Sequence, residues 1–503
     1  MASEAEGGTR AAPRPALIAL FCVAVAASLV LRWPRLTESL WYDEQYRTRA
    51  VLHSDRVADL FLHDVHNPLY NAFMYVWVGV FGDSEIVIRL PSLLAGYLSL
   101  GLFCSLLRRR MGIAAAACVA LWCLVAPMHL WYCTEAKNNM FVLAFATLAL
   151  WSVDRMVERP TKVRTAFASF ALVAAFYTDL VAVLVITPLI LWTFGQSRRA
   201  EAAERTALRR AGWVVTVVTL ACATPWAVFK AMHVHQLWRG YLEPFRPREV
   251  VELLGGMFMT GHAFAPLTPT RTWVALGVFI LILPLLALGG RTLWRAGRAR
   301  VLVLLMMFGM GGMALASAVV DALYTGREHY IYQPRNLLCL LYVFAAILWV
   351  GVTRVRPVAL RAAVGGVLMT GTLAASVCTL TVHADRYTVD KPRSDWREVV
   401  AVIESDAGDA AVVAVSRSPV QQLEHYSEQI DTCTTWGEPV EIEDLEAAEA
   451  SAESADEDPE LYYVSDLDWW PVLDTELEQW RKEYVVREVG RVDRVVIYAL
   501  DPR

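Results

Sequence analysis

Charged side chains are scarce in this chain: Asp, Glu, Lys and Arg make up 19% of its 503 residues, against 56% hydrophobic residues. A soluble protein of this length does not need such an apolar excess. Repeated apolar stretches of about 18–20 residues are instead typical of membrane-spanning helices. The scarcity of charge therefore argues against an ordinary soluble protein and predicts an integral membrane protein.

The sequence also lacks the closely spaced Cys and His pairs of a structural zinc site, although it holds nine cysteines. Seven of these lie within apolar runs, where a thiol behaves as a small buried hydrophobic group. Cys133 and Cys433 lie outside those runs, and whether they pair is left open. No nucleic-acid partner is expected.

The few charges are unevenly divided along the chain. Residues 383–503 hold 30 Asp and Glu against 11 Lys and Arg, a net charge of −19, whereas residues 1–382 carry +14. Such a division predicts two domains with different surroundings. We expect a membrane domain over 15–382, preceded by a polar tail (1–14), and a soluble domain over 383–503.

Eleven apolar runs predict membrane-spanning helices. In chain order they cover residues 15–31, 88–107, 112–128, 138–154, 164–178, 180–195, 211–231, 272–289, 301–320, 336–353 and 362–381. A cleaved signal peptide is the alternative for the first run. Its length, and its direct passage into a charged segment, favour a retained first helix.

A further run, residues 68–82, is shorter than the ~20 residues that a span needs. If this run lies along the membrane surface, every Arg-rich loop falls on one side, which the positive-inside rule assigns to the cytoplasm. We therefore expect a juxtamembrane amphipathic helix there. The N-terminus is then cytoplasmic and the C-terminal domain extracytoplasmic, at the plasma or inner membrane.

Helical and strand patterns alternate in the C-terminal domain and predict a small α/β fold. Helices are expected at 395–403, 420–429 and 475–484, and strands at 410–416, 461–467 and in the two apolar stretches near the C-terminus. Residues 438–460 are acidic and alanine-rich, which is typical of a disordered insertion. No catalytic constellation is evident in this domain.

The segment Leu40–Tyr70, within the predicted outer loop 34–87, is dense in ionisable groups that lipid rejects. A carboxylate beside a membrane span is a functional-site hypothesis by default. The predicted topology brings many polar residues to this same level: Asp43, Glu44, Asp64, His66, Arg89, Glu135, Lys137, Asp179, His262, Arg327, Tyr332 and Arg335. Acids there can take a proton from a hydroxyl, and Arg or Lys can hold a phosphate.

These residues have ordinary alternatives too. An arginine near a helix end, such as Arg89, often reaches the lipid headgroups. His262 can be a plain loop histidine, and Glu135 with Lys137 an exposed ion pair that contributes little. Asp43–Glu44 is the one place where position and residue type favour function.

At these residues the sequence resembles the C-type membrane glycosyltransferases that use polyprenyl-phosphate sugars. It is most similar to the protein O-mannosyltransferase and aminoarabinose-transferase-like group. The motifs that carry the resemblance occur in matching order: WYDE (41–44), DVHNPLY (64–70), FGDSEIVIRLPSLLAG (81–96), TEAKNNM (134–140), FYTDL (176–180), YQPRNLL (332–338) and DWREVV (395–400). The glutamate–lysine pair of the aminoarabinose branch is absent at 65–66, where this chain has Val65 and His66.

The resemblance implies a catalytic base at Asp43, with Glu44 beside it. It implies donor-phosphate contacts at His66, Arg89, Lys137 and Arg335. Secondary candidates are Asp64, Glu135, Asp179, His262, Arg327 and Tyr332. A divalent metal near His66, present in some members, is left open, and no other cofactor is expected.

The function predicted on this basis is a mannosyltransferase-like hexosyl- or pentosyltransferase of the cell envelope. It would move a sugar from a polyprenyl-phosphate donor to a hydroxyl of a protein, lipid or glycan, with inversion. A lipid or solute transporter or flippase is one alternative. Transporters, however, place charges near mid-membrane and often contain inverted repeats, which this sequence lacks. A catalytically inactive envelope scaffold is the other.

Overall fold

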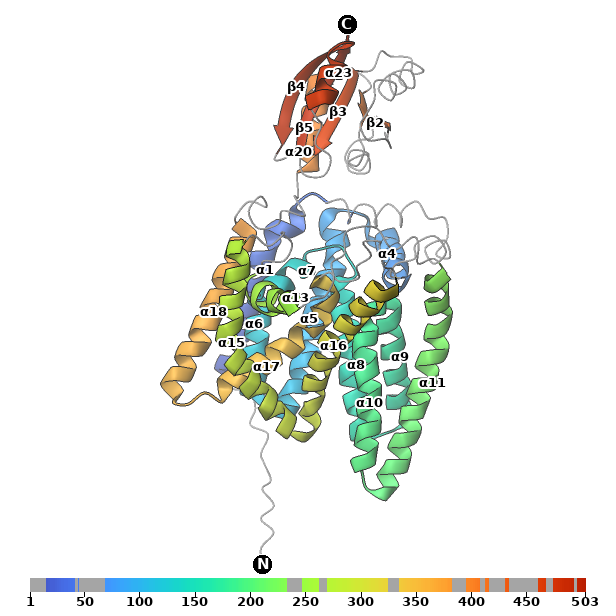
Figure 1. The fold of residues 1–503 in the computed structure, drawn as a ribbon, viewed down its shortest axis with the longest axis vertical. Helices are drawn as coiled ribbons and strands as arrows, with labels where there is room; N and C mark the ends of the chain where they lie inside the picture. Colours follow the sequence, from blue (N-terminus) through green and yellow to red (C-terminus); the bar gives the residue numbers. More distant parts are fainter. Residues whose placement is uncertain are drawn as a thin grey trace, which may run out of the picture.

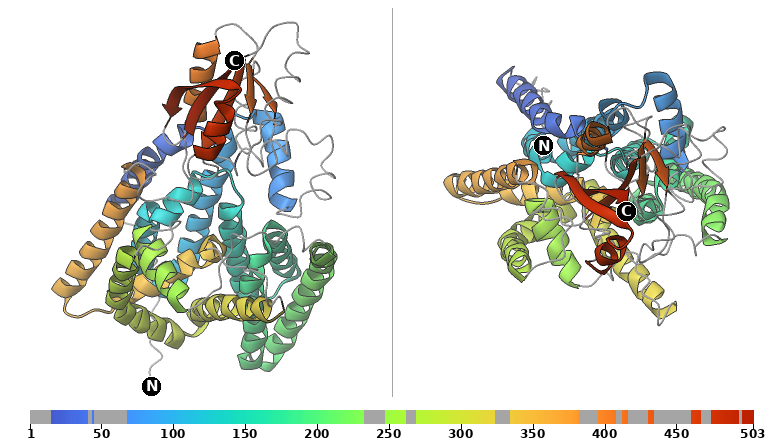
Figure 2. Two further views of the ribbon diagram at one scale, coloured as in Figure 1. Left: turned by 45° about the horizontal axis from the view of Figure 1, so that its top comes forward. Right: turned by 90° about the horizontal axis from the view of Figure 1, so that it is seen from above.

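The computed structural model describes residues 15–40, 44, 68–232, 247–261, 269–323, 334–381, 395–407, 412–415, 430–433, 460–466, 474–492 and 495–503. Within these ranges a bundle of helices carries a small sheet domain at one end (Figure 1). We call that end of the bundle the domain end. Seen from the domain end, the sheet lies over the bundle (Figure 2).

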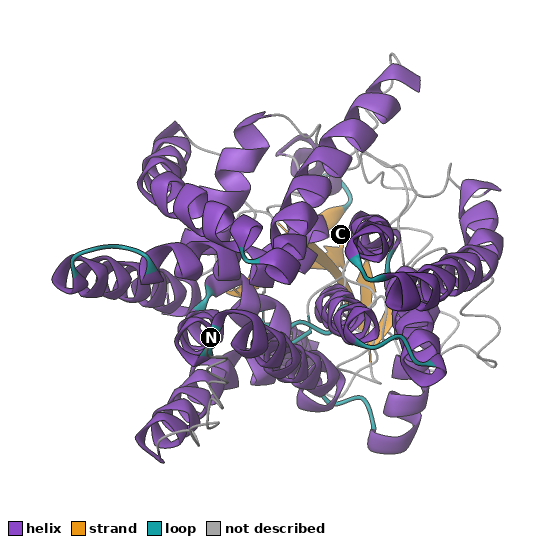
Figure 3. Cartoon of the chain, turned by 90° about the horizontal axis from the view of Figure 1, so that it is seen from below, coloured by secondary structure: helices purple, strands orange, loops and turns teal. Residues whose placement is uncertain are grey.

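The bundle contains helices of very different lengths. In chain order they are α1 (Pro15–Thr37), α4 (Pro68–Phe81), α5 (Glu85–Met111), α6 (Ile113–Val125), α7 (Pro127–Cys133), α8 (Asn139–Glu158), α9 (Lys162–Thr178), η1 (Leu180–Ala182), α10 (Val183–Arg199), α11 (Ala202–Met232), α13 (Pro247–Val251), η2 (Glu252–Met257), α14 (Phe258–Thr260), α15 (Pro269–Arg295), η3 (Gly297–Ala299), α16 (Arg300–Leu323), η4 (Pro334–Leu340), α17 (Leu341–Thr353) and α18 (Val358–Thr381). Seen from the end opposite the sheet, they fill the view (Figure 3).

Each of the eleven predicted runs coincides with a described helix or with two consecutive ones. Eight of the described helices are long and apolar enough to cross a bilayer, or nine when α6 and α7 count as one span bent by 60°. The polytopic helical fold is confirmed, whereas the number of eleven spans stays a prediction. The helix predicted over 68–82 is α4, whose 14 residues reach only about 21 Å, less than a bilayer core of about 30 Å.

The centre of the bundle is α17, whose residues from Leu341 to Val352 are all buried. It lies against α15 at a glycine contact. A Cβ atom added at Gly289 would lie 1.8 Å from the carbonyl oxygen of Ile347, and one added at Gly351 would lie 2.0 Å from that of Leu285. Small residues permit this close approach of two helix backbones in a membrane.

The bend between α6 and α7 has a local cause. Pro127 begins α7, and the residue before a proline is disfavoured in helical geometry, so Ala126 is extended with φ −65° and ψ 131°. The short helix α7 therefore leaves the direction of α6 and leads directly to residues 134–138. We call these residues the α7–α8 loop.

The C-terminal domain is a five-stranded mixed sheet with strand order β2-β1-β3-β5-β4. Its elements are α20 (Trp396–Ala407), β1 (Val412–Val415), β2 (Ile430–Cys433), β3 (Glu460–Asp466), α23 (Asp474–Trp480), β4 (Tyr484–Val492) and β5 (Val495–Pro502). Strand β1 pairs in parallel with β2 and β3, while β5 is antiparallel to β3 and β4. The predicted α/β class is confirmed. The predicted helix 420–429, residues 438–459 of the predicted insertion and the boundary at 382–383 lie outside the described residues, whereas Glu460, the last residue of that insertion, begins β3.

Asp406 ties α20 to the sheet. Its carboxylate accepts hydrogen bonds from Tyr462 at 2.8 Å and from both terminal nitrogens of Arg487 at 2.9 and 3.0 Å. The Arg487 hydrogen bond lowers the pKa of the Asp406 carboxyl. A depressed folded-state pKa means that the group adds stability above its unfolded pKa, and this stability is lost as pH falls through the folded-state pKa.

We therefore expect Asp406→Asn to lower the unfolding temperature of the domain near pH 7, with the deficit shrinking as pH falls below the ordinary Asp pKa of about 3.9. Because Arg487 is 48% exposed, the effect should be that of a partly exposed ion pair, about 0.2–1 kcal/mol. Thermal scans of the full chain from pH 7 to pH 3 measure it, with the exposed Glu478→Gln as control. A deficit that is independent of pH would contradict the assignment.

Candidate functional site

Glu44 and Arg89 form a completely buried ion pair at the domain end of the bundle. Arg89 donates from Nη2 to Oε2 of Glu44 at 2.6 Å and from Nε to Oε1 at 3.1 Å, and both side chains are 0% exposed. The backbone N–H of Ala136 donates to the same Oε1 at 2.7 Å. This is the two-pronged geometry that suits a guanidinium to a carboxylate. The pair thus joins Glu44, the last residue of the WYDE motif, to α5 and to the α7–α8 loop.

Arg89 also binds the backbone that follows α1. Its Nη1 donates to the carbonyl oxygens of Arg35 at 3.0 Å, Leu36 at 3.4 Å and Glu38 at 2.5 Å. Its Nη2 donates to that of Ser39 at 3.0 Å. The last carbonyls of a helix have no partner within the helix, so a side chain that binds them fixes how the helix ends. All three guanidinium nitrogens of Arg89 therefore contact residues 35–44.

The α7–α8 loop holds two further predicted residues. Glu135 is 0% exposed and accepts a hydrogen bond from Asn139 Nδ2 at 3.0 Å. Lys137 is 4% exposed, and its carbonyl oxygen accepts from Ser92 Oγ at 3.3 Å. The alternative that these two residues are surface-exposed is wrong, because both are buried beside the Glu44–Arg89 pair.

Asp179 stands at the turn between α9 and η1. One carboxylate oxygen accepts from the backbone N–H of Val181 at 3.0 Å, which caps η1, and the other accepts from Asn138 Nδ2 at 3.0 Å. An acidic side chain at this position satisfies a free N–H of the first turn. Asp179 thereby anchors the α7–α8 loop to a second helical turn, as expected for residues at one level.

An apolar cluster supports the site from the α4 side. Leu40, Tyr70, Met74 and Ala136 are buried together with Phe141. The rings of Tyr70 and Phe141 meet edge to face with centroids 5.0 Å apart, a favourable aromatic geometry. Because Leu40 lies in this cluster, the segment that leaves α1 is held by apolar packing as well as by Arg89.

The structure thus brings five of the predicted residues into one region: Glu44, Arg89, Glu135, Lys137 and Asp179. Arg335 lies in η4, and its side chain is outside the described part of the chain. The remaining predicted residues also fall outside it: Asp43, Asp64, His66, His262, Arg327 and Tyr332. Their roles, and the phosphate-binding role of Arg89 and Lys137, stay predictions.

Among the residues that the structure describes, no group of three or more His, Cys, Asp or Glu side chains is placed to hold a metal ion. The residue for which a metal was left open, His66, is not among them.

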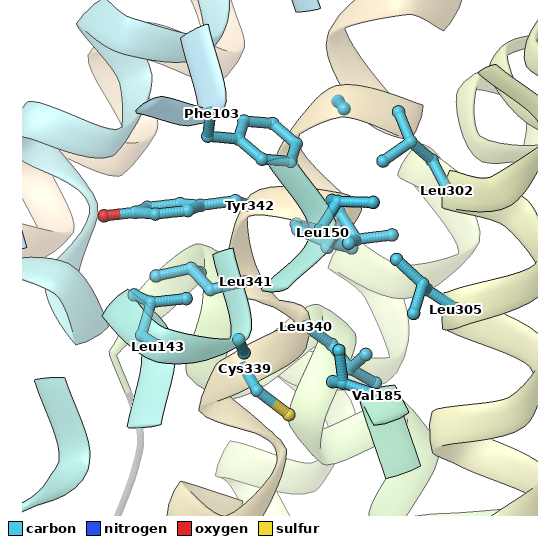
Figure 4. Close-up of a cluster of buried hydrophobic side chains, with 14 of the residues drawn as sticks. Phe103, Leu143, Leu150, Val185, Leu302, Leu305, Cys339, Leu340, Leu341 and Tyr342 are labelled. Atoms are coloured by element: carbon cyan, nitrogen blue, oxygen red, sulfur yellow. The ribbon is translucent and has the colours of Figure 1, made fainter. Parts of the chain in front are cut away.

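A second buried polar network consists of residues that were not predicted from the sequence. Arg32 of α1, 0% exposed, donates from Nη2 to Nδ1 of His129 at 3.0 Å. His129 Nε2 lies 3.0 Å from the hydroxyl of Tyr342, which donates to the carbonyl oxygen of Gly96 at 3.1 Å. An arginine can only donate, so Nδ1 accepts and the ring proton sits on Nε2. Figure 4 shows the Tyr342 hydroxyl pointing away from the apolar cluster around Phe103.

This network links α1, α5, α7 and α17, and α7 leads directly into the α7–α8 loop. The signal that could have found it is simple. Arg32 and His129 are ionisable residues next to or within apolar runs, and such residues mark functional or structural centres in membrane proteins.

The sequence matches the model of one protein family. The dolichyl-phosphate-mannose-protein mannosyltransferase family model matches residues 65–229. This match covers α4 to α10 and all but the last three residues of α11, including Arg89, the α7–α8 loop and Asp179. No curated protein matches the sequence.

The whole chain is similar in fold to solved structures of membrane glycosyltransferases. ArnT from Cupriavidus metallidurans in the apo state has a TM-score of 0.59 at 14% identity, covering 96% of this chain and 98% of that one. The same protein bound to undecaprenyl phosphate has a TM-score of 0.57 at 14% identity, covering 97% of this chain and 98% of that one. The Archaeoglobus fulgidus oligosaccharyltransferase tethered to an acceptor peptide has a TM-score of 0.50 at 12% identity, covering 95% of this chain and 74% of that one. The resemblance stated from the motifs is confirmed by the family model and by the fold.

Proposed function

We propose that this protein is an integral membrane glycosyltransferase that moves a sugar from a polyprenyl phosphate to an acceptor hydroxyl at the domain end, on the extracytoplasmic side. The observation that carries the proposal is the buried Glu44–Arg89 pair, which holds Glu44 of the WYDE motif against α5, the α7–α8 loop and the residues that follow α1. Undecaprenyl phosphate bound to the similar ArnT, and dolichyl phosphate-mannose in the description of the matching family, support this class of donor.

The chemistry requires few groups. In a polyprenyl-phosphate sugar the leaving group is a phosphate, which is stable as an anion and needs cationic stabilisation rather than a general acid. One carboxylate is then sufficient to take the proton of the acceptor hydroxyl. We assign this role to Asp43, which directly precedes Glu44 in the sequence. In-line attack opposite the phosphate inverts the anomeric centre.

The contacts of Arg89 separate its role from that of the other cations. Its three guanidinium nitrogens bind Glu44 and the end of α1, so we assign it to positioning the WYDE motif. Lys137 lies on the loop whose Ala136 amide binds Glu44. We assign donor-phosphate binding to Lys137, together with His66 and Arg335.

Lys137→Gln is expected to raise the donor KM about 10- to 100-fold, since a hydrogen bond to a charged group contributes about 1.5–3 kcal/mol. Lys137→Arg should retain much of the affinity, because Arg also binds phosphate. Steady-state kinetics with varied donor measures both, and Lys162→Gln, exposed at the start of α9, is the matched control. A donor KM unchanged in a folded Lys137→Gln variant would contradict the phosphate role.

Transfer can be separated from transport in sealed vesicles that contain a polyprenyl-phosphate sugar labelled in the sugar. A transferase cleaves the sugar–phosphate bond, so label moves to an acceptor and free polyprenyl phosphate accumulates. A flippase moves the intact donor between leaflets without cleavage, and a scaffold changes neither quantity. Cleavage that depends on this protein supports the proposal, whereas leaflet exchange without cleavage overturns it.

A further inference from the structure

The C-terminal domain contacts the bundle at the segment that follows α1. Within the described residues, Arg397 of α20 donates from Nη2 to the carbonyl oxygen of Thr37 at 2.9 Å. Its Nη1 lies 3.5 Å from the carboxylate of Glu85 at the start of α5. The backbone N–H of Trp396 donates to Ser39 Oγ at 3.2 Å. Residues separated by about 360 positions in the chain therefore meet at the end of α1.

Ser39 is shared between this contact and the candidate site. Its hydroxyl accepts from Trp396, and its carbonyl oxygen accepts from Arg89, which in turn binds Glu44. The turn that leaves α1 is thus held by Arg89 from the bundle and by Arg397 from the domain. A displacement of α20 changes the hydrogen bonds of the residues that lead to the WYDE motif.

The domain can act on this turn as a unit. Trp396, Val399 and Ile403 of α20 are buried against Tyr462 and Ile497 of the sheet. The start of α20 is also fixed locally, because the Asp395 carboxylate accepts from the backbone N–H of Arg397 at 3.2 Å. Whatever moves the sheet therefore moves Arg397 with it.

The contact is suited to modulation rather than to stability. Arg397 is 46% exposed and its distance to Glu85 is long, so the ion pair contributes little to folding. By contrast, Arg89 and Glu44 are wholly buried. A weak, partly exposed contact beside a buried ion pair can shift the populations of the site's conformations while the fold remains intact.

We propose that Arg397, together with the Trp396 amide, is a positioning contact through which the C-terminal domain sets the conformation of residues 35–44 and so the rate of transfer. This inference rests on the proposed function for its effect on rate, but not for its effect on conformation. Arg397 touches neither donor nor acceptor in this account. Its loss should therefore change kcat and leave the donor KM unaffected.

The test compares Arg397→Ala with Arg491→Ala. Both arginines lie in the C-terminal domain and are 46% and 53% exposed, but Arg491 pairs with Glu488 of its own strand, β4, and, among the described residues, not with α20 or the bundle. Hydrogen exchange by mass spectrometry on the full chain in lipid nanodiscs should show faster exchange over 35–44 in Arg397→Ala only. This readout does not depend on activity.

Kinetics provide the second readout. We expect Arg397→Ala to lower kcat about five- to tenfold with the donor KM within twofold, the size of coupling seen for such contacts. Arg397→Lys, which keeps the positive charge and an ammonium donor group, should restore most of the lost kcat, and Arg491→Ala should match the wild type.

Exchange over 35–44 that is unchanged in Arg397→Ala overturns the inference, whatever the activity. Faster exchange without any detectable transferase activity in the wild type retains the conformational contact and overturns the proposed function instead. A donor KM that rises in Arg397→Ala, or an equal loss of kcat in Arg491→Ala, overturns the positioning role.

Discussion

Asp43→Asn is expected to lower sugar transfer by about 10²–10⁴-fold while leaving expression and donor binding unchanged. The amide has nearly the shape of the carboxylate but cannot take the proton of an acceptor hydroxyl. Attack on the anomeric carbon then starts from a neutral, weakly nucleophilic alcohol. Initial rates with saturating labelled donor measure the loss, and equilibrium binding of the donor lipid measures retained affinity.

The matched control is Asp55→Asn in the same outer loop, since Asp55 and Asp59 fit the polar face of a surface helix in the sequence. Asp55→Asn should transfer sugar at the wild-type rate. Turnover by Asp43→Asn comparable to that of Asp55→Asn would remove Asp43 from the mechanism. A variant that fails to bind donor would instead indicate a structural role.

Arg89→Met is expected to destabilise the membrane domain by about 3–5 kcal/mol, the cost of leaving one member of a buried ion pair without its partner. The Glu44 carboxylate would remain 0% exposed with the Ala136 amide as its remaining partner among those described above. The carbonyl oxygens at the end of α1 would lose their donor as well. Thermal unfolding in detergent, followed by size-exclusion chromatography, measures the loss.

Two further variants separate a positioning role of Arg89 from phosphate binding. Arg89→Lys keeps the charge but cannot serve Glu44 and the α1 carbonyls together, so we expect reduced stability with a lower kcat. The exposed Arg108→Lys on the same helix should behave as wild type. An Arg89→Lys protein of full stability whose donor KM alone rises would show that Arg89 is a phosphate ligand.

The sequence predicted the helical segments because each needs only an apolar run of sufficient length. It also predicted the level at which Glu44, Arg89, Lys137 and Asp179 meet, because the positive-inside rule orders loops by side. The helix α4 was predicted from a short apolar run, and its position along the membrane surface, which rests on the positive-inside rule, stays a prediction. Strand β2 was missed, since IDTC is only four residues long and half polar.

The sequence could not predict which of these polar residues contact one another. Glu44 and Arg89 are 45 residues apart, and nothing in their spacing distinguishes a buried pair from two solvated charges. The same holds for Arg32 and His129, 97 residues apart, and for Ser39 and Trp396. Such contacts depend on how helices cross, which hydrophobic periodicity does not encode.

The most direct test of the proposed function uses the purified full chain in lipid nanodiscs, a polyprenyl-phosphate sugar of known anomeric configuration and an extract of envelope acceptors. A transferase releases free polyprenyl phosphate in step with the appearance of sugar on an acceptor. We also expect a product of opposite anomeric configuration, and the loss of both signals in Asp43→Asn. Donor that binds and stays intact, or a product that retains the configuration of the donor, would contradict the proposed function.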